Sequence, residues 1–88
     1  MKHYNIEYKS SVEKDFRKLP SKIINKIQDN IIELANNPYP DGYIKLSGSE
    51  NLYRIRVGNY RIIYSIDNEL TKIIIHYIRH RKDVYKDL

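Results

Sequence analysis

The sequence predicts an α+β domain in which a small, mostly antiparallel sheet packs on a helical hairpin, in the order β-α-α-β-β-β with a short helical turn at the end. Three observations predict this fold: one alternating segment at the start, two adjoining segments with helical periodicity, and three alternating segments separated by turn residues. The 88 residues have the length of one small domain, which we expect to span residues 1–88.

The first half of the chain predicts one strand and two helices. Apolar and polar residues alternate over residues 4–8, which is typical of a strand. Ser10 and Glu13 form a capping-box pattern, so we expect a helix to begin there. Pro20 ends this helix or starts the next, because proline is not tolerated in a helix interior. The second helix carries one apolar stripe and ends at the Asn-Asn-Pro sequence of residues 36–38.

The second half predicts a loop followed by three strands. Turn residues dominate residues 39–48, which we expect to be a loop. The alternating segments that follow predict strands over residues 51–57, 60–66 and 71–79. Gly58-Asn59 is a two-residue hairpin turn, so Val57 and Tyr60 should be cross-strand partners. The polar tail from His80 onward has the length of about one helical turn.

The composition limits the class of partner and the compartment. Sixteen Lys and Arg against eleven Asp and Glu give a net charge of +5 and a pI of about 9.4, which favours a polyanion such as nucleic acid. The absence of Cys excludes disulfides and thiolate metal sites. No apolar run approaches the roughly 20 residues of a membrane span, and the first residues do not resemble a signal peptide. We therefore expect a cytoplasmic protein without membrane contact, metal or cofactor.

Five of the six arginines lie in the second half of the chain, namely Arg54, Arg56, Arg61, Arg79 and Arg81. Because side chains alternate along a strand, Arg54 and Arg56 should project from the face opposite the apolar residues. The two-residue turn then places Arg56 opposite Arg61. Like charges in that arrangement destabilise a sheet, and arginine is well suited to bidentate phosphate contacts. The cluster therefore predicts a phosphate-binding surface.

An alternative interpretation is that acidic residues neutralise this cluster, the candidates being Glu50, Asp67 and Asp83. Two other residues of the last predicted strand are expected to have structural roles. His76 has the opposite parity to Arg79 and should point away from the arginine face. Tyr77 should fill the core or its rim.

Two segments together resemble a known family. The sequence LYRIRVGNYRIIY over residues 52–64 and the sequence HRKDVY over residues 80–85 closely resemble the RelE branch of the RelE/ParE toxin superfamily. The family consists of small bacterial toxins of type II toxin–antitoxin modules. The resemblance covers essentially the whole chain and implies the RelE-like fold. It also implies a toxin that enters the ribosomal A site and cleaves the bound mRNA, whereas ParE members poison DNA gyrase.

The resemblance places the family's catalytic roles on Arg54, Arg56, Arg61, Arg81 and Tyr85. The implied reaction is a metal-free attack of the RNA 2′-hydroxyl on the adjacent phosphate, in which preorganised cations stabilise developing charge. Arg81 would act at the leaving 5′-oxygen, and Tyr85 would stack on or orient a base. Contacts to RNA are also expected from Lys45, Arg79 and Lys82.

The general base is left open by the sequence. The best-known family members have lysine where this chain has Arg54 and Arg56, and arginine does not readily release a proton. The candidates are His80, Tyr85, a lysine such as Lys45, and ribosomal RNA itself.

Two alternatives to the endoribonuclease remain at this stage. One is a ParE-like inhibitor of DNA gyrase, and the other is an RNA-binding module without chemistry, whose binding would depend steeply on salt. The implied partners are the 70S ribosome, mRNA and a cognate acidic antitoxin. We expect the free protein to be a monomer and its complex with the antitoxin to be a hetero-oligomer.

Overall fold

The computed structural model describes residues 3–46, 48 and 51–82 and has the predicted order of elements with one addition. The elements are β1 (Asn5–Tyr8), α1 (Val12–Arg17), α2 (Ser21–Asn36), β2 (Ile44–Lys45), β3 (Leu52–Val57), β4 (Tyr60–Asp67) and β5 (Lys72–His80). The predicted α+β fold is confirmed. The predicted final helical turn, Tyr85 and the acidic candidates Glu50 and Asp83 lie outside the described residues.

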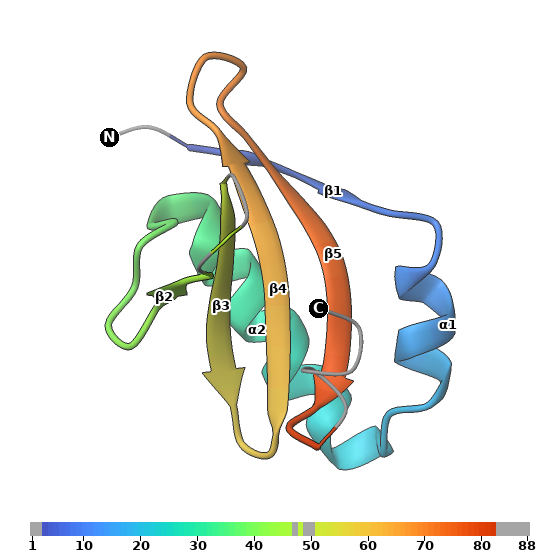
Figure 1. The fold of residues 1–88 in the computed structure, drawn as a ribbon. Helices are drawn as coiled ribbons and strands as arrows, with labels where there is room; N and C mark the ends of the chain where they lie inside the picture. The colour runs from blue at the N-terminus through green and yellow to red at the C-terminus, as the bar shows by residue number, and fades with distance from the viewer. Residues whose placement is uncertain (1–2, 47, 49–50, 83–88) are drawn as a thin grey trace.

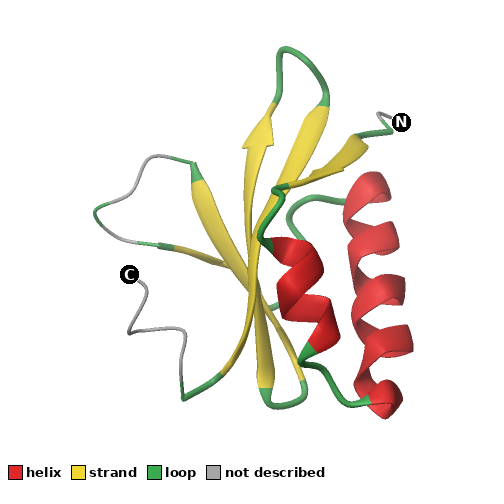
Figure 2. Ribbon diagram, turned by 90° about the vertical axis from the view of Figure 1, so that its right-hand side faces the viewer, coloured by secondary structure: helices red, strands yellow, loops and turns green. Residues whose placement is uncertain are grey.

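The strands form one sheet in the order β1-β5-β4-β3-β2 (Figure 1). β1 is parallel to β5, and the other neighbours are antiparallel. Both helices lie against one face of this sheet, as Figure 2 shows. Among the described residues no helix lies on the opposite face, which we call the open face.

Two local predictions are wrong. The predicted loop at residues 39–48 contains β2, whose two residues pair antiparallel with β3. An exposed strand of two residues is too short to show alternation in the sequence. The predicted capping box also does not form, because Ser11 occupies the N-cap of α1 and its side chain makes no capping hydrogen bond. Here the packing of α1 rather than its cap determines where the helix begins.

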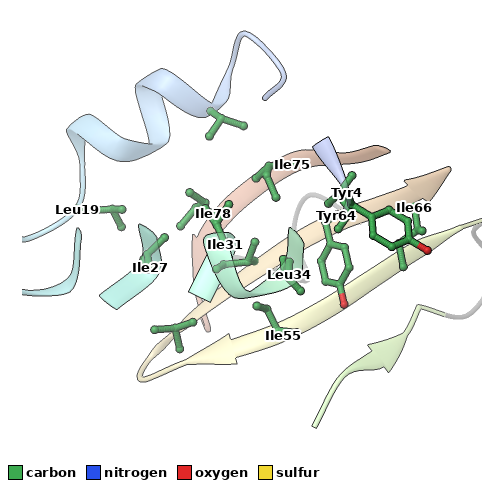
Figure 3. Close-up of a cluster of buried hydrophobic side chains, with 14 residues drawn as sticks. Tyr4, Leu19, Ile27, Ile31, Leu34, Ile55, Tyr64, Ile66, Ile75 and Ile78 are labelled. Carbon is green, nitrogen blue, oxygen red and sulfur yellow. The ribbon is translucent and has the colours of Figure 1, made fainter. Parts of the chain in front are cut away.

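The core lies between α2 and the sheet. Ile27 and Ile31 of α2 are completely buried against the strands, where Ile75 and Tyr64 are equally inaccessible (Figure 3). Fully burying an isoleucine stabilises a fold by about 1.5–3 kcal/mol. This layer therefore fixes which strand residues face inward, and the alternating residues must face outward. Among the described residues, no helix is long and apolar enough to span a membrane.

Tyr64 carries the most deeply buried polar group of this layer. Its hydroxyl donates a hydrogen bond of 2.7 Å to the carbonyl of Pro38, just after α2. Burial, with a smaller contribution from Tyr39, raises the pKa of the Tyr64 phenol. The hydrogen bond joins the end of α2 to the centre of the sheet.

We expect Tyr64→Phe to lower the free energy of unfolding by about 1–3 kcal/mol at neutral pH, because the Pro38 carbonyl loses its partner. In the wild type the pKa of Tyr64 is raised in the folded state. The contribution of its neutral phenol to the free energy of unfolding is therefore fully present below the ordinary pKa of 10.0 and is lost as pH rises above that value. The variant should therefore lose less stability between pH 9 and about pH 11. Urea unfolding across this range measures both effects, and an unchanged alkaline slope would contradict the assignment.

Candidate functional site

Three rows of cross-strand neighbours cover the open face. The first row consists of Arg56, Arg61 and Arg79, and we call it the arginine row. The second row consists of Arg54, Ile63 and Tyr77, and the third of Leu52, Ser65 and Ile74. The predicted pairing of Arg56 with Arg61 is confirmed, and so is the expected position of Arg79, which lies beside Arg61 on the other side.

Protein groups hold each guanidinium of the arginine row. The Nε of Arg56 donates to the carbonyl of Gly58 at 3.0 Å, and Nη1 of Arg61 donates to the carbonyl of Tyr60 at 3.3 Å. Arg79 forms an ion pair with Asp15 of α1. The row therefore presents oriented cations rather than three freely moving side chains.

Asp15 is the residue that sequence reasoning missed. Its side chain is only 6% exposed, and Oδ2 accepts a hydrogen bond of 3.0 Å from the backbone N–H of Ile78. β1 pairs with β5 only up to Ile75, so Asp15 caps the edge that β1 leaves open. One signal was present in the sequence, since Asp15 lies on the apolar stripe of its helix, three residues after Val12.

Among the described residues, Asp15 is the acidic residue that meets the cluster, and the predicted candidate Asp67 does not. Asp67 lies at the far end of β4, where its carboxylate accepts a hydrogen bond of 2.9 Å from the N–H of Leu70. Asp15 is paired with Arg79, at one end of the row. Arg56, at the other end, is exposed to solvent.

Arg54 lies in the second row beside Ile63. Ile63 is completely buried although it faces away from the helices, and it does not belong to the helix-side core. Arg54 itself is partly buried. Its aliphatic stem can cover an apolar neighbour while the head group remains near the surface.

Arg81 lies beside the turn between β3 and β4. Its backbone N–H donates to the carbonyl of Asn59 at 2.7 Å, and its side chain is exposed. Lys82 is exposed next to it. The carbonyl that accepts the hydrogen bond from Arg56 belongs to Gly58 of the same turn. Arg81 therefore lies at the same end of the sheet as the arginine row.

His80 and Lys45 are not brought to the open face. His80 pairs with Tyr60, their ring centroids are 5.3 Å apart, and Tyr60 packs against the helix-side core. Lys45 pairs with Tyr53, which also packs against that core. Directly opposed residues of antiparallel strands share a face. Both candidates therefore lie on the helix side, and Lys45 is exposed at the sheet edge.

The prediction that His76 points away from the arginine face is wrong. The register between β4 and β5 shifts at residues 63–64, where Ile63 pairs with Tyr77 but Tyr64 pairs with Ile75. His76 is the extra residue of this β-bulge, and a bulge changes the alternation of side chains. Its Nε2 lies 2.9 Å from Oγ of Ser65. Tyr77 likewise faces outward rather than filling the core, with the guanidinium of Arg79 4.9 Å from its ring centroid.

The pKa of His76 is lowered, first by burial and then by the nearby ammonium of Lys9. We expect its ring to titrate below the ordinary value of 6.5 in a ¹H–¹⁵N NMR titration. The stabilisation from a neutral His76 is present above pH 6.5 and is lost as pH falls through the folded-state pKa. His76→Gln should reduce this acid-side loss of stability. A ring that titrates at or above 6.5 would contradict the prediction.

The chemistry available on the open face is charge stabilisation. Neighbouring residues of the arginine row have Cβ atoms about 4.5–5.5 Å apart, and their fixed cations suit the oxygens of a phosphate backbone. Among the residues that the structure describes, no three His, Asp or Glu side chains gather closely enough to hold a metal ion.

Comparisons with known proteins give a consistent result. A family model described as the ParE toxin of the type II toxin–antitoxin system parDE matches residues 6–85. Toxin RelE3 of Methanocaldococcus jannaschii is 37% identical over 82% of this chain and 84% of its own length. A chain of the archaeal RelE–RelB complex from Pyrococcus horikoshii OT3 has a similar fold, with a TM-score of 0.79, 30% identity, and coverage of 92% of this chain and 97% of that one. The toxin–antitoxin complex RelBE2 of Mycobacterium tuberculosis contains another similar chain, with a TM-score of 0.79, 26% identity, and coverage of 90% and 99%.

Proposed function

Because this chain belongs to the RelE/ParE superfamily of type II toxin–antitoxin toxins, we propose that it is a ribosome-dependent endoribonuclease, which cleaves mRNA in the ribosomal A site and thereby inhibits translation. The observation that carries this proposal is the arginine row on the sheet face opposite the two helices. A gathering of like charges reduces stability, and a polyanionic substrate would compensate for it.

The proposed reaction is an intramolecular phosphoryl transfer within the RNA. The 2′-oxygen of the nucleotide before the cut forms a bond to phosphorus, and the bond from phosphorus to the 5′-oxygen of the next nucleotide breaks. The 2′-hydroxyl loses a proton to a base, and the leaving 5′-oxygen gains one. The nucleophile belongs to the RNA, so the reaction needs no metal ion, and the protein's task is positioning and charge stabilisation.

We assign the stabilisation of the phosphorane-like charge to Arg61, with Arg56 and Arg54 beside it. Arg61 is the central member of the arginine row and is held by the Tyr60 carbonyl. Arg81, at the same end of the sheet, would act at the leaving oxygen. Lys82 and Arg79 would contact neighbouring phosphates, and Tyr85 would orient a base.

The positions of two candidates reduce the number of groups that can act as the general base. His80 and Lys45 lie on the helix side of the sheet, away from the arginine row. Proton transfer requires a base within hydrogen-bond reach of the proton that it removes. We therefore propose that Tyr85 or a group of the ribosome accepts the 2′-proton.

An antitoxin partner is supported by the structural relatives, which were solved as complexes with RelB antitoxins. We propose that the cognate antitoxin is acidic and covers the open face, because the arginine row would complement its charge. The free toxin would be a monomer, and the complex a hetero-oligomer. Size-exclusion chromatography with light scattering of the toxin alone and with its antitoxin would test both statements.

The experiment that tests the activity is cell-free translation with the purified toxin, followed by mapping of mRNA 5′ ends by primer extension. New ends within translated codons, which disappear when initiation is blocked, are expected. Transcripts that remain uncut would overturn the proposal.

The second candidate function is inhibition of DNA gyrase, because the matching family model is described as ParE. This candidate predicts that the toxin blocks supercoiling by purified gyrase and leaves mRNA intact in the translating extract. The two assays with the same protein preparation therefore separate the candidates.

A further inference from the structure

A second group of side chains lies on the open face next to the arginine row, and the β-bulge adds His76 to it. We call Ser65, His76 and Tyr77 the bulge patch. The Nε2 of His76 lies 2.9 Å from Oγ of Ser65, and the rings of His76 and Tyr77 are 6.4 Å apart. Arg79 links the patch to the arginine row, because its guanidinium lies over the Tyr77 ring, 4.9 Å from the centroid.

The helix-side core does not account for this patch. None of its three residues belongs to the buried cluster beneath the helices, and all three are partly buried rather than enclosed. A bulge interrupts the pairing of two strands, and without it His76 would follow the alternation and face the helices. The bulge therefore brings to the open face an imidazole ring that strict alternation would place on the helix side.

We propose that the bulge patch is a base-binding subsite for single-stranded RNA, which holds a nucleotide adjacent to the phosphate at the arginine row. This inference rests on the proposed endoribonuclease function. It assigns the recognition of a base to Ser65, His76 and Tyr77, and it assigns charge stabilisation to the arginines.

The spacing of the rows suits this assignment. Successive rows on one face are two residues apart, which is about 6.6–6.8 Å along a strand. Tyr77 lies in the row next to the arginine row, and Ser65 lies one row further. An RNA strand whose phosphate contacts Arg61 would thus carry a neighbouring base over Tyr77 and toward Ser65.

The chemistry of the patch also suits a nucleobase. Aromatic rings are usual stacking partners of unstacked RNA bases, and Tyr77 and His76 supply two rings on the open face. The Ser65 hydroxyl has one donor and two acceptor positions, of which His76 occupies one. The remaining capacity suits the edge of a base, which offers donors and acceptors side by side.

The test is a map of cleavage sites produced by the wild type and by Ser65→Ala, His76→Gln and Tyr77→Leu in a translating extract, with all 5′ ends sequenced. We expect the wild type to prefer certain bases beside the cut. The ratio of cleavage at the most and least preferred base should fall by about tenfold in the variants, which is the effect of one good base contact. Cleavage at the least preferred base should remain.

The matched control is Tyr8→Leu. Tyr8 is also a partly exposed tyrosine with one aromatic neighbour, Phe16 at 6.4 Å, but it faces α1 rather than the open face. Its variant should keep the wild-type pattern. Thermal unfolding of each variant establishes that it is folded, and Ser65→Ala removes only one oxygen if the larger substitutions destabilise the domain.

The outcomes separate the two proposals. If the wild type cuts no mRNA, the proposed function is overturned, and the subsite with it. If the wild type cuts but all three variants keep its base preference, only the subsite is overturned. A uniform loss of cleavage at every base, or a loss of antitoxin binding with an unchanged pattern, would equally contradict base recognition.

Discussion

Arg61→Ala is expected to lower ribosome-dependent mRNA cleavage by about 10²–10³-fold, the usual effect of removing one preorganised charge-stabilising donor. Arg61 is flanked by Arg56 and Arg79 across the neighbouring strands, so its loss removes the centre of the arginine row. The free energy of unfolding should change by no more than about 1 kcal/mol, since relief of like-charge repulsion offsets the lost packing. Single-turnover cleavage of a programmed ribosome measures the first quantity, and urea unfolding measures the second.

The control for Arg61→Ala is Arg17→Ala, which makes the same change of charge on α1. Arg17 is exposed and pairs with Glu13 at 2.8 Å, and exposed pairs of this kind contribute at most about 1 kcal/mol. Its variant should cleave like the wild type. If the two variants cleave equally, whether both are active or both are impaired, the position of Arg61 on the open face does not determine the cleavage activity.

Asp15→Ala is expected to lower the free energy of unfolding by about 3–5 kcal/mol, because removing one partner leaves a buried charge pair broken. The Ile78 N–H loses its acceptor, and the Arg79 guanidinium loses the carboxylate with which it pairs. Small domains have a total stability of about 5–15 kcal/mol, so the melting temperature should fall by at least about 12 °C. Calorimetry or thermal circular dichroism measures the change.

Two further variants identify the cause of this loss. Asp15→Asn keeps an oxygen that can accept the Ile78 N–H but removes the negative charge, so its effect should be smaller than that of Asp15→Ala. Glu13→Ala removes an exposed carboxylate of the same helix and should change stability by no more than about 1 kcal/mol. If Asp15→Ala is as mild as Glu13→Ala, the contact with β5 does not support the fold.

Much of the fold could be predicted because its signals are local. The pairing of Arg56 with Arg61 follows from the two-residue turn at Gly58-Asn59, which lies between them and sets the register. The start of α2 after Pro20 and the apolar stripe of this helix likewise follow from residues that are close together in the sequence. Predictions of this kind need no knowledge of the rest of the chain.

Apart from the capping box of Ser10 and Glu13, which is a local pattern, the predictions that failed depended on distant partners. β2 exists only because β3 pairs with it, and two residues give no periodicity. The direction of His76 depends on a bulge in the pairing of β5 with β4, and strict alternation cannot reveal an inserted residue.

The sequence alone determined the fold class, the family and the presence of arginines on one sheet face, because these depend on local periodicity, turn chemistry and short motifs. Only the tertiary structure decided which groups surround those arginines. Asp15 and Arg79 are 64 positions apart in the chain, and Ser65 meets His76 only through the bulge. Such contacts form when the helix-side core aligns the strands, so the packing of α2 on the sheet, rather than any local pattern, arranges the open face.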